Sequence, residues 1–121
     1  MHTNVMKKPD VVNILGIRYT IEYVDNPAEV DKDKRKSLWG QIDYWERKIR
    51  IYDNGRPDED VFQTLMHEII HAIDEALHLE LCEENKGHDK IDLIALALTD
   101  VVFRNEWLTL LGGEENALDT R

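Results

Sequence analysis

The chain has 121 residues, of which 42% are hydrophobic and 33% charged, and its formal net charge is −10. This balance is typical of one soluble globular domain with a modest core and excludes an intrinsically disordered chain. An acid excess of this size repels nucleic-acid phosphates, and no Lys/Arg cluster offsets it, so we expect no nucleic-acid partner. No apolar run approaches the roughly 20 residues of a membrane span, so we expect no membrane partner.

The N-terminus and the cysteine content bear on location. Residues 1–10 are polar, with Lys7 and Lys8, and lack the apolar stretch of a signal peptide. Cys82 is the only cysteine, which excludes an intrachain disulfide. We therefore expect a cytoplasmic protein.

The first half of the chain predicts strands. Residues 14–24 alternate between two faces around β-branched and aromatic side chains, which indicates a half-buried strand. The charged residues 25–36 predict a loop with one helical turn. Residues 38–44 and 48–52 are two further strand candidates, and a turn near residues 44–47 would join them as a hairpin.

The second half predicts two helices. Pro57 suits a first helical position, and the three acidic residues after it suit the positive end of a helix dipole. We expect helices over residues 57–79 and 88–111, because apolar residues recur there with helical spacing. The predicted fold is therefore α+β, with a small antiparallel sheet of about three strands packed on two main helices.

The centre of the first helix, His67-Glu68-Ile69-Ile70-His71, reads HExxH. Residues four apart share a helix face, so the two imidazoles can close on one metal ion. Glu68 then lies beside the metal, where its carboxylate can take a proton from a bound water. Zinc-dependent peptide hydrolysis uses this grouping, so we predict one Zn²⁺ per chain on His67 and His71, with Glu68 as the catalytic base.

The surroundings of the motif support a metal over its alternative, a solvated polar stripe with two incidental histidines. Apolar residues flank the motif, and burying imidazoles and a carboxylate without partners is costly, whereas a metal satisfies them. Asp74 lies three residues beyond His71 on the same face. It is a candidate to orient an imidazole.

A catalytic zinc needs a third protein ligand and an open position for water. His78 lies about 10 Å along the helix axis from His71, too far to reach the same ion. The third ligand is therefore expected near the start of the next helix. Asp92, one turn after His88, either ligates the metal or orients a ligand. The candidates are Glu83, Glu84, His88, Asp89 and Asp92.

The motif and the segments around it resemble a known family. The similarity spans about residues 38–105 and includes residues 40–44, 49–51, 64–73 and 94–98, closing at residues 104–105. In these segments the chain resembles the small HExxH metallopeptidase-like proteins of phages and mobile elements, which are related to the ImmA/IrrE peptidases. The resemblance implies a minimal zincin-like domain, which we place at residues 11–112, with flexible tails over residues 1–10 and 113–121.

The resemblance also implies a ligand set. In that family the third ligand, usually Glu, precedes a small residue of the second helix by seven positions. Counting back from Ala95 gives His88, so a histidine stands where the family has a carboxylate. A site of His67, His71 and His88 is chemically sound for zinc.

The activity implied is that of a metallopeptidase (hydrolase) acting on one protein or peptide substrate, such as a repressor. Zinc lowers the pKa of a bound water, and Glu68 takes its proton and returns it to the leaving amine. Tyr44 and His78 are candidates to stabilise the oxyanion. The alternative is a zinc-stabilised, non-catalytic binding or regulatory protein of phage type, in which Asp92 or Glu84 fills the open metal position.

Overall fold

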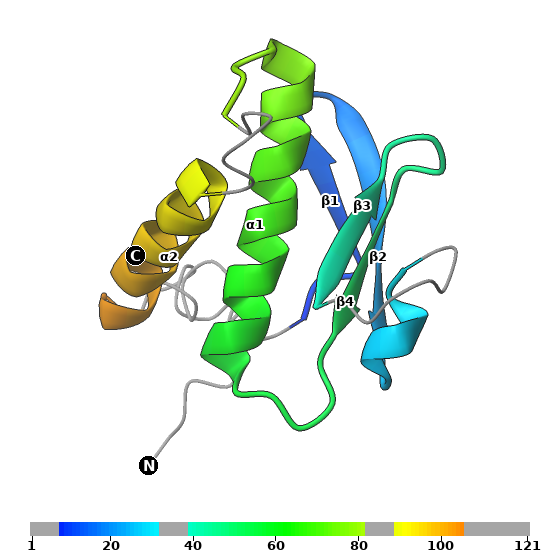
Figure 1. Cartoon of the computed structure of the whole chain (residues 1–121), viewed down its shortest axis with the longest axis vertical. Helices are drawn as coiled ribbons and strands as arrows, with labels where there is room; N and C mark the ends of the chain where they lie inside the picture. Colours follow the sequence, from blue (N-terminus) through cyan, green and yellow to red (C-terminus); the bar gives the residue numbers. More distant parts are fainter. Residues whose placement is uncertain (1–7, 32–38, 82–88, 106–121) are drawn as a thin grey trace, which may run out of the picture.

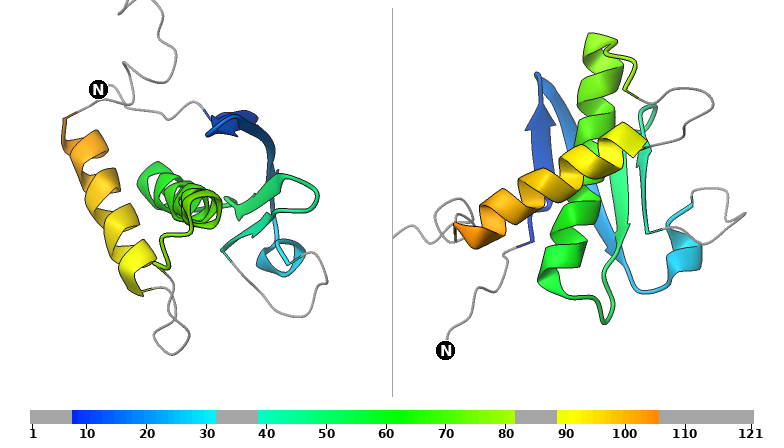
Figure 2. Two further views of the ribbon diagram at one scale, coloured as in Figure 1. Left: turned by 90° about the horizontal axis from the view of Figure 1, so that it is seen from above. Right: turned by 60° about the vertical axis from the view of Figure 1, so that its left-hand side comes forward.

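The structure is a computed structural model that describes residues 8–31, 39–81 and 89–105. A sheet, α1 and α2 form three layers, with α1 between the sheet and α2 (Figures 1 and 2). In the described part of the chain, no helix is long and apolar enough to cross a membrane. The elements in chain order are β1 (Val11–Ile14), β2 (Ile17–Val24), the 3-10 helix η1 (Pro27–Glu29), β3 (Gly40–Asp43), β4 (Lys48–Tyr52), α1 (Asp58–Leu77) and α2 (Asp89–Arg104).

The sheet has the strand order β1-β2-β4-β3. β1 with β2 and β3 with β4 are antiparallel pairs, whereas β2 and β4 run parallel. The predicted α+β class with two main helices is confirmed. The sheet has four strands instead of about three, and it is mixed because the second arm of the β3–β4 hairpin inserts beside β2.

The additional strand arises from a tight turn inside the segment predicted as one strand. Leu15 and Gly16 have φ values of 52° and 88°, and both central residues of a two-residue type I′ turn need positive φ. The Asn13 side chain accepts a hydrogen bond from the Gly16 amide at 2.9 Å. Leu-Gly lacks the Asn-Gly or Asp-Gly pattern that announces such turns, so the expected single strand over residues 14–24 was wrong at its start.

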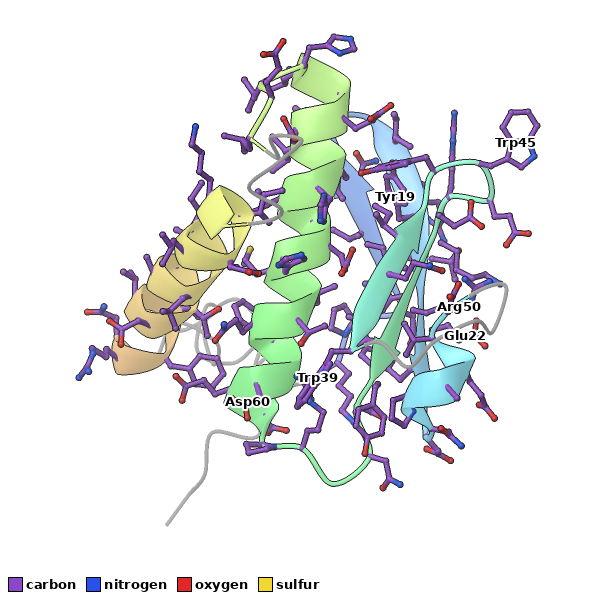
Figure 3. The ribbon with its side chains drawn as sticks, viewed as in Figure 1. Tyr19, Glu22, Trp39, Trp45, Arg50 and Asp60 are labelled. Atoms are coloured by element: carbon purple, nitrogen blue, oxygen red, sulfur yellow. The ribbon has the colours of Figure 1, made fainter. Side chains whose placement is uncertain are left out.

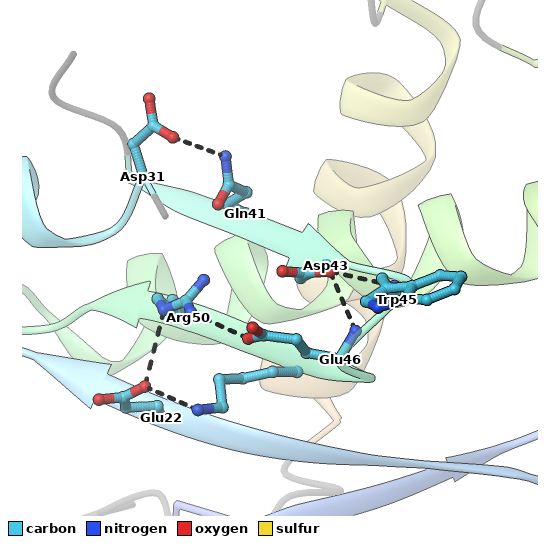
Figure 4. Close-up of polar contacts among 8 residues, drawn as sticks. Glu22, Asp31, Gln41, Asp43, Trp45, Glu46 and Arg50 are labelled. Carbon is cyan, nitrogen blue, oxygen red and sulfur yellow. Dashed lines mark hydrogen bonds and ion pairs between the residues drawn. The ribbon is translucent and has the colours of Figure 1, made fainter. Parts of the chain in front are cut away.

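The predicted β3–β4 hairpin is confirmed. Asp43 Oδ1 accepts hydrogen bonds from the amides of Trp45 and Glu46, at 3.0 and 3.1 Å, and Arg47 has a left-handed φ of 57° (Figure 4). On the outer sheet face, Arg50 lies between Glu46 and Glu22, at 3.5 and 3.7 Å. This face is polar, so the apolar face of the sheet packs on α1.

The core lies on both sides of α1. Residues from the sheet and from α1 form the larger cluster, and residues from α1 and α2 form the smaller one. Because α1 is packed from two sides, a strip of its surface remains between β3 and α2. That strip carries the HExxH motif. The larger buried cluster is Ile14, Tyr19, Ile21, Ile49, Ile51, Val61, Leu65 and Ala72, and the smaller is Ile70, Ile91 and Ala95.

The helix ends differ slightly from the prediction. α1 begins at Asp58 after Pro57 and ends at Leu77, where His78 adopts a left-handed φ of 54°. α2 is described to Arg104, and the rest of the predicted helix over residues 88–111 lies outside the described residues. Of the predicted tails over residues 1–10 and 113–121, residues 1–7 and 113–121 also lie outside them. Residues 8–10 are described and contact β2, where the Tyr23 hydroxyl donates to the Pro9 carbonyl oxygen at 2.9 Å and the Ile21 amide to that of Asp10 at 2.7 Å.

Candidate metal centre and active site

Gly40, the first residue of β3, allows β3 to approach α1 closely. A Cβ at this position would lie 2.6 Å from Thr64 Cγ2 and 3.0 Å from Glu68 Oε2. Contacts under 3.0 Å between such atoms essentially never occur, so a side chain here would push the strand away. The glycine therefore places the start of β3 directly against the motif glutamate.

Substitution of Gly40 tests this close approach. We expect Gly40→Ala to lower the free energy of unfolding by about 1–3 kcal/mol, as overpacking of a tight contact does. Urea unfolding would measure the loss. Thr64→Ser removes the methyl group that the new Cβ meets, so Gly40→Ala should cost less in a Thr64→Ser background. Equal costs in both backgrounds would contradict the contact.

His67 and His71 lie on successive turns of α1, and both are half-buried. Their ring centroids are 4.8 Å apart, with an interplanar angle of 65°. The helix therefore brings the two imidazoles side by side on one face, as the HExxH spacing predicts.

Asp92 of α2 contacts the first of these imidazoles. Its Oδ1 lies 2.8 Å from His67 Nδ1. A carboxylate on Nδ1 favours the tautomer protonated there, in which Nε2 carries the lone pair that a metal needs. Asp92 thus stands where an orienting carboxylate of a metal-binding histidine would stand.

We expect Asp92→Asn to weaken zinc binding by about 10- to 100-fold, as loss of such an orienting carboxylate typically does. Competition with a chromophoric chelator would measure the affinity. Asp100→Asn is the matched control, because Asp100 lies on the same helix and its Oδ1 accepts from Arg104 Nε at 2.7 Å. An equal loss in both variants would mean that Asp92 acts only through surface charge.

Glu68 is buried, with 5% of its surface exposed. Desolvation, followed by the charge of Asp92, raises the pKa of its carboxyl from 4.5 to about 8. Among the described residues, no hydrogen bond to this carboxyl is found. A cation beside it would stabilise the ionised form, so the position suits a carboxylate that works next to a metal.

His67, Glu68 and Asp92 line one cavity of about 480 Å³. It lies between β3, the first half of α1 and α2, on the strip of α1 left uncovered by packing. Both an imidazole of the motif and its glutamate reach it, so a ligand in the cavity would meet them together. Its lining residues are Trp39, Gly40, Arg56, Asp60, Gln63, Thr64, His67, Glu68 and Asp92.

The other candidate residues that the structure describes do not line this cavity. Asp74 Oδ1 accepts a hydrogen bond from the Leu81 amide at 3.1 Å, so it fixes the chain that follows α1. The Tyr44 hydroxyl donates to the His71 carbonyl oxygen at 3.1 Å, and burial raises the pKa of Tyr44. His78 is exposed at the end of α1.

Of the candidates for a third metal ligand, the structure describes the side chain of Asp92. Among the described residues, no group of three His, Cys, Asp or Glu side chains is arranged to hold a metal ion. His67 and His71 would supply two donors, and Asp92 lies against His67. His88, Glu83 and Glu84, and the side chain of Asp89, lie outside the described residues.

Two cavity residues, Trp39 and Arg56, were not predicted as a pair from the sequence. Nothing in their spacing along the chain links them, although Arg56 lies just before α1 and Trp39 just before β3.

Comparisons with protein-family models, curated proteins and solved structures find no match to this chain. Function is therefore inferred from the site itself.

Proposed function

We propose that the protein is a zinc-dependent metallopeptidase that hydrolyses a peptide bond in a specific protein substrate. The observation that supports this most is that His67 and the buried Glu68 carboxyl line one cavity, with the His71 imidazole beside that of His67. The contact of Asp92 with His67 Nδ1 adds the orienting carboxylate that metal-binding histidines usually have.

His67 and His71 would hold the metal, with His88, Asp92 or Glu84 as the candidates for a third donor. Neutral imidazoles in this arrangement suit zinc. Zinc bound there would supply a Lewis acid that polarises the substrate carbonyl and lowers the pKa of the attacking water.

The protein's own groups would handle the protons and the position of the substrate. Glu68 takes a proton from the attacking water and passes it to the leaving amine. Burial keeps this carboxyl away from bulk water, so its proton exchange is directed to groups in the cavity. β3 forms an edge of the sheet beside the cavity, and such an edge can hold an extended peptide by strand addition.

A second candidate is a zinc-stabilised regulatory protein that cleaves nothing. Asp92 favours it, because this carboxylate lines the same cavity as Glu68 and could complete the metal's coordination in place of water. The two candidates differ in whether water reaches the metal.

Cleavage of a proteome-derived peptide library, followed by mass spectrometry, tests the proposal. We expect the zinc-loaded protein to cut a narrow set of peptides and Glu68→Gln to cut none of them. DNA-binding repressors are the first intact substrates to try, on the resemblance described above. Cleavage that persists in Glu68→Gln contradicts the mechanism, and a zinc-loaded protein that cuts nothing favours the regulatory candidate.

A further inference from the structure

Trp39 presents a large apolar surface at the rim of the cavity. The residue directly precedes β3, and its side chain is 60% exposed and lines the same cavity as His67 and Glu68. Figure 3 shows it between α1 and β3, on the same side of the molecule as Asp60. Its exposed surface is therefore available to a ligand that occupies the cavity.

The indole is held in place on two sides. The Arg56 guanidinium lies over its ring at 4.0 Å, and the Tyr52 ring meets it edge-on at 6.2 Å between centroids. The backbone is fixed as well, since the Trp39 carbonyl oxygen accepts a hydrogen bond from the Tyr52 amide at 2.9 Å. The exposed ring is therefore pre-organised, which lowers the entropy lost when a ligand binds it.

Hydrogen bonds fix the Arg56 guanidinium in its place over the Trp39 ring. Its Nη1 donates to the Tyr52 carbonyl oxygen at 2.6 Å, and its Nη2 donates to Thr64 Oγ1 at 2.7 Å and to the Asp60 carbonyl oxygen at 3.1 Å. Its Nε is buried and has no hydrogen-bond partner among the described residues. Burial lowers the pKa of Arg56, and the Asp60 carboxylate acts in the opposite direction. The guanidinium thus supports Trp39, because both of its terminal nitrogens donate to protein acceptors.

We propose that the exposed surface of Trp39 is the subsite for an aromatic or large aliphatic side chain of the substrate, close to the scissile bond. This inference rests on the proposed peptidase function. An aromatic side chain stacks favourably on an indole, and an aliphatic one buries apolar surface there. Trp39 is then a specificity-determining residue for substrate recognition.

Charged side chains fit this subsite less well. A cation on the ring meets opposing forces, because the Arg56 guanidinium over the ring repels it and the carboxylates of the cavity attract it. It therefore gains little from charge, while it loses hydration on the ring. An anion would meet the Asp60 and Asp92 carboxylates, which line the same cavity. An uncharged, apolar side chain avoids both costs.

Peptide binding, measured without turnover, tests the subsite. Four pools of acetylated octapeptides carry Phe, Leu, Lys or Glu at the fourth position and random residues elsewhere. Each pool is titrated into full-length, zinc-supplied Glu68→Gln protein. Titration calorimetry measures the affinity, and ¹⁵N NMR follows the indole N–H signals of the tryptophans. We expect the Phe and Leu pools to shift the Trp39 signal and to bind about tenfold more tightly than the Lys and Glu pools.

Two variants separate recognition from folding. Trp39→Ala should abolish the preference for Phe and Leu, and Trp39→Phe should restore most of it. Trp45→Ala is the matched control, because Trp45 is 90% exposed at the β3–β4 turn and does not line the cavity. The Trp45 variant should keep the preference.

The subsite and the proposed activity fail in different ways. Equal binding of all pools, no binding of any pool, or a preference unchanged in Trp39→Ala overturns the subsite. Absence of cleavage by the zinc-loaded wild-type protein, with the Phe and Leu preference intact, overturns the peptidase and leaves an apolar peptide-binding site.

Discussion

Zinc added to the metal-free protein is expected to raise its melting temperature by on the order of 10 °C when it exceeds its dissociation constant about 100-fold. The physical reason is that the folded chain holds His67 and His71 side by side, with ring centroids 4.8 Å apart, whereas the unfolded chain does not. His67→Ala and His71→Ala should each remove most of the shift, since each deletes a donor. Differential scanning fluorimetry with and without zinc measures the response.

His78→Asn is the matched control for this experiment. His78 lies on the same helix as the motif but is exposed at its end with a left-handed φ, which asparagine also tolerates. The control should respond to zinc as the wild-type protein does. A full response in both motif variants would contradict the metal site. Loss of the response in His88→Ala would assign the third ligand to His88, and retention would move it to Asp92 or Glu84.

Local spacing explains why much of the site was predictable. The four-residue separation of the histidines determines that they share a helix face, whatever the helix packs against. The β3–β4 hairpin was likewise predicted from two short strand candidates separated by a short turn. These features depend on neighbours in sequence, which a single chain shows directly.

The rest of the fold depends on contacts between segments that are far apart in sequence. The parallel pairing of β2 with β4 places the second arm of a hairpin in the middle of the sheet, and no local pattern signals that order. The β1–β2 turn uses Leu15 and Gly16, without the residues that usually mark it. Tertiary packing determines both the position of β4 beside β2 and the turn between β1 and β2.

The same distinction holds within the cavity. Asp92 was predicted as either a ligand or an orienting residue, and only the packing of α2 on α1 places it on His67 Nδ1. The stacking of Arg56 on Trp39 joins the start of α1 to the start of β3, so spacing along the chain does not announce it. Gly40 shows its role only through the side chains of α1 that lie against it.

The metal-free protein is expected to lose stability as the pH rises from about 4.5 to about 8, because of Glu68. Its pKa is 4.5 ordinarily and about 8 in the folded chain, since burial and the Asp92 charge both disfavour the carboxylate. Between these values the folded state binds the proton and the unfolded state does not, so the stability contributed below pH 4.5 is lost progressively through pH 8. The loss should be a few kcal/mol, at about 1.4 kcal/mol per pKa unit.

Glu68→Gln isolates this effect, because glutamine has nearly the same shape and does not titrate. At pH 8 in EDTA, the variant should be more stable than the wild-type protein by a few kcal/mol, and the gap should shrink towards pH 4.5. Urea unfolding across this pH range measures the difference in free energy of unfolding between the variant and the wild-type protein. The other titrating groups are present in both proteins, so their contributions cancel in this difference. Glu75→Gln, an exposed position on the same helix, should leave the wild-type pH dependence in place.

Zinc should lower the raised pKa of Glu68 and so weaken the dependence of stability on pH. A dication on the neighbouring imidazoles stabilises the Glu68 carboxylate, so its pKa falls and the loss of stability with rising pH diminishes in the zinc-loaded protein. A difference between Glu68→Gln and wild type that is the same with zinc and with EDTA would mean that the metal binds away from Glu68. A difference that vanishes on adding zinc would place the metal beside the buried Glu68 carboxyl.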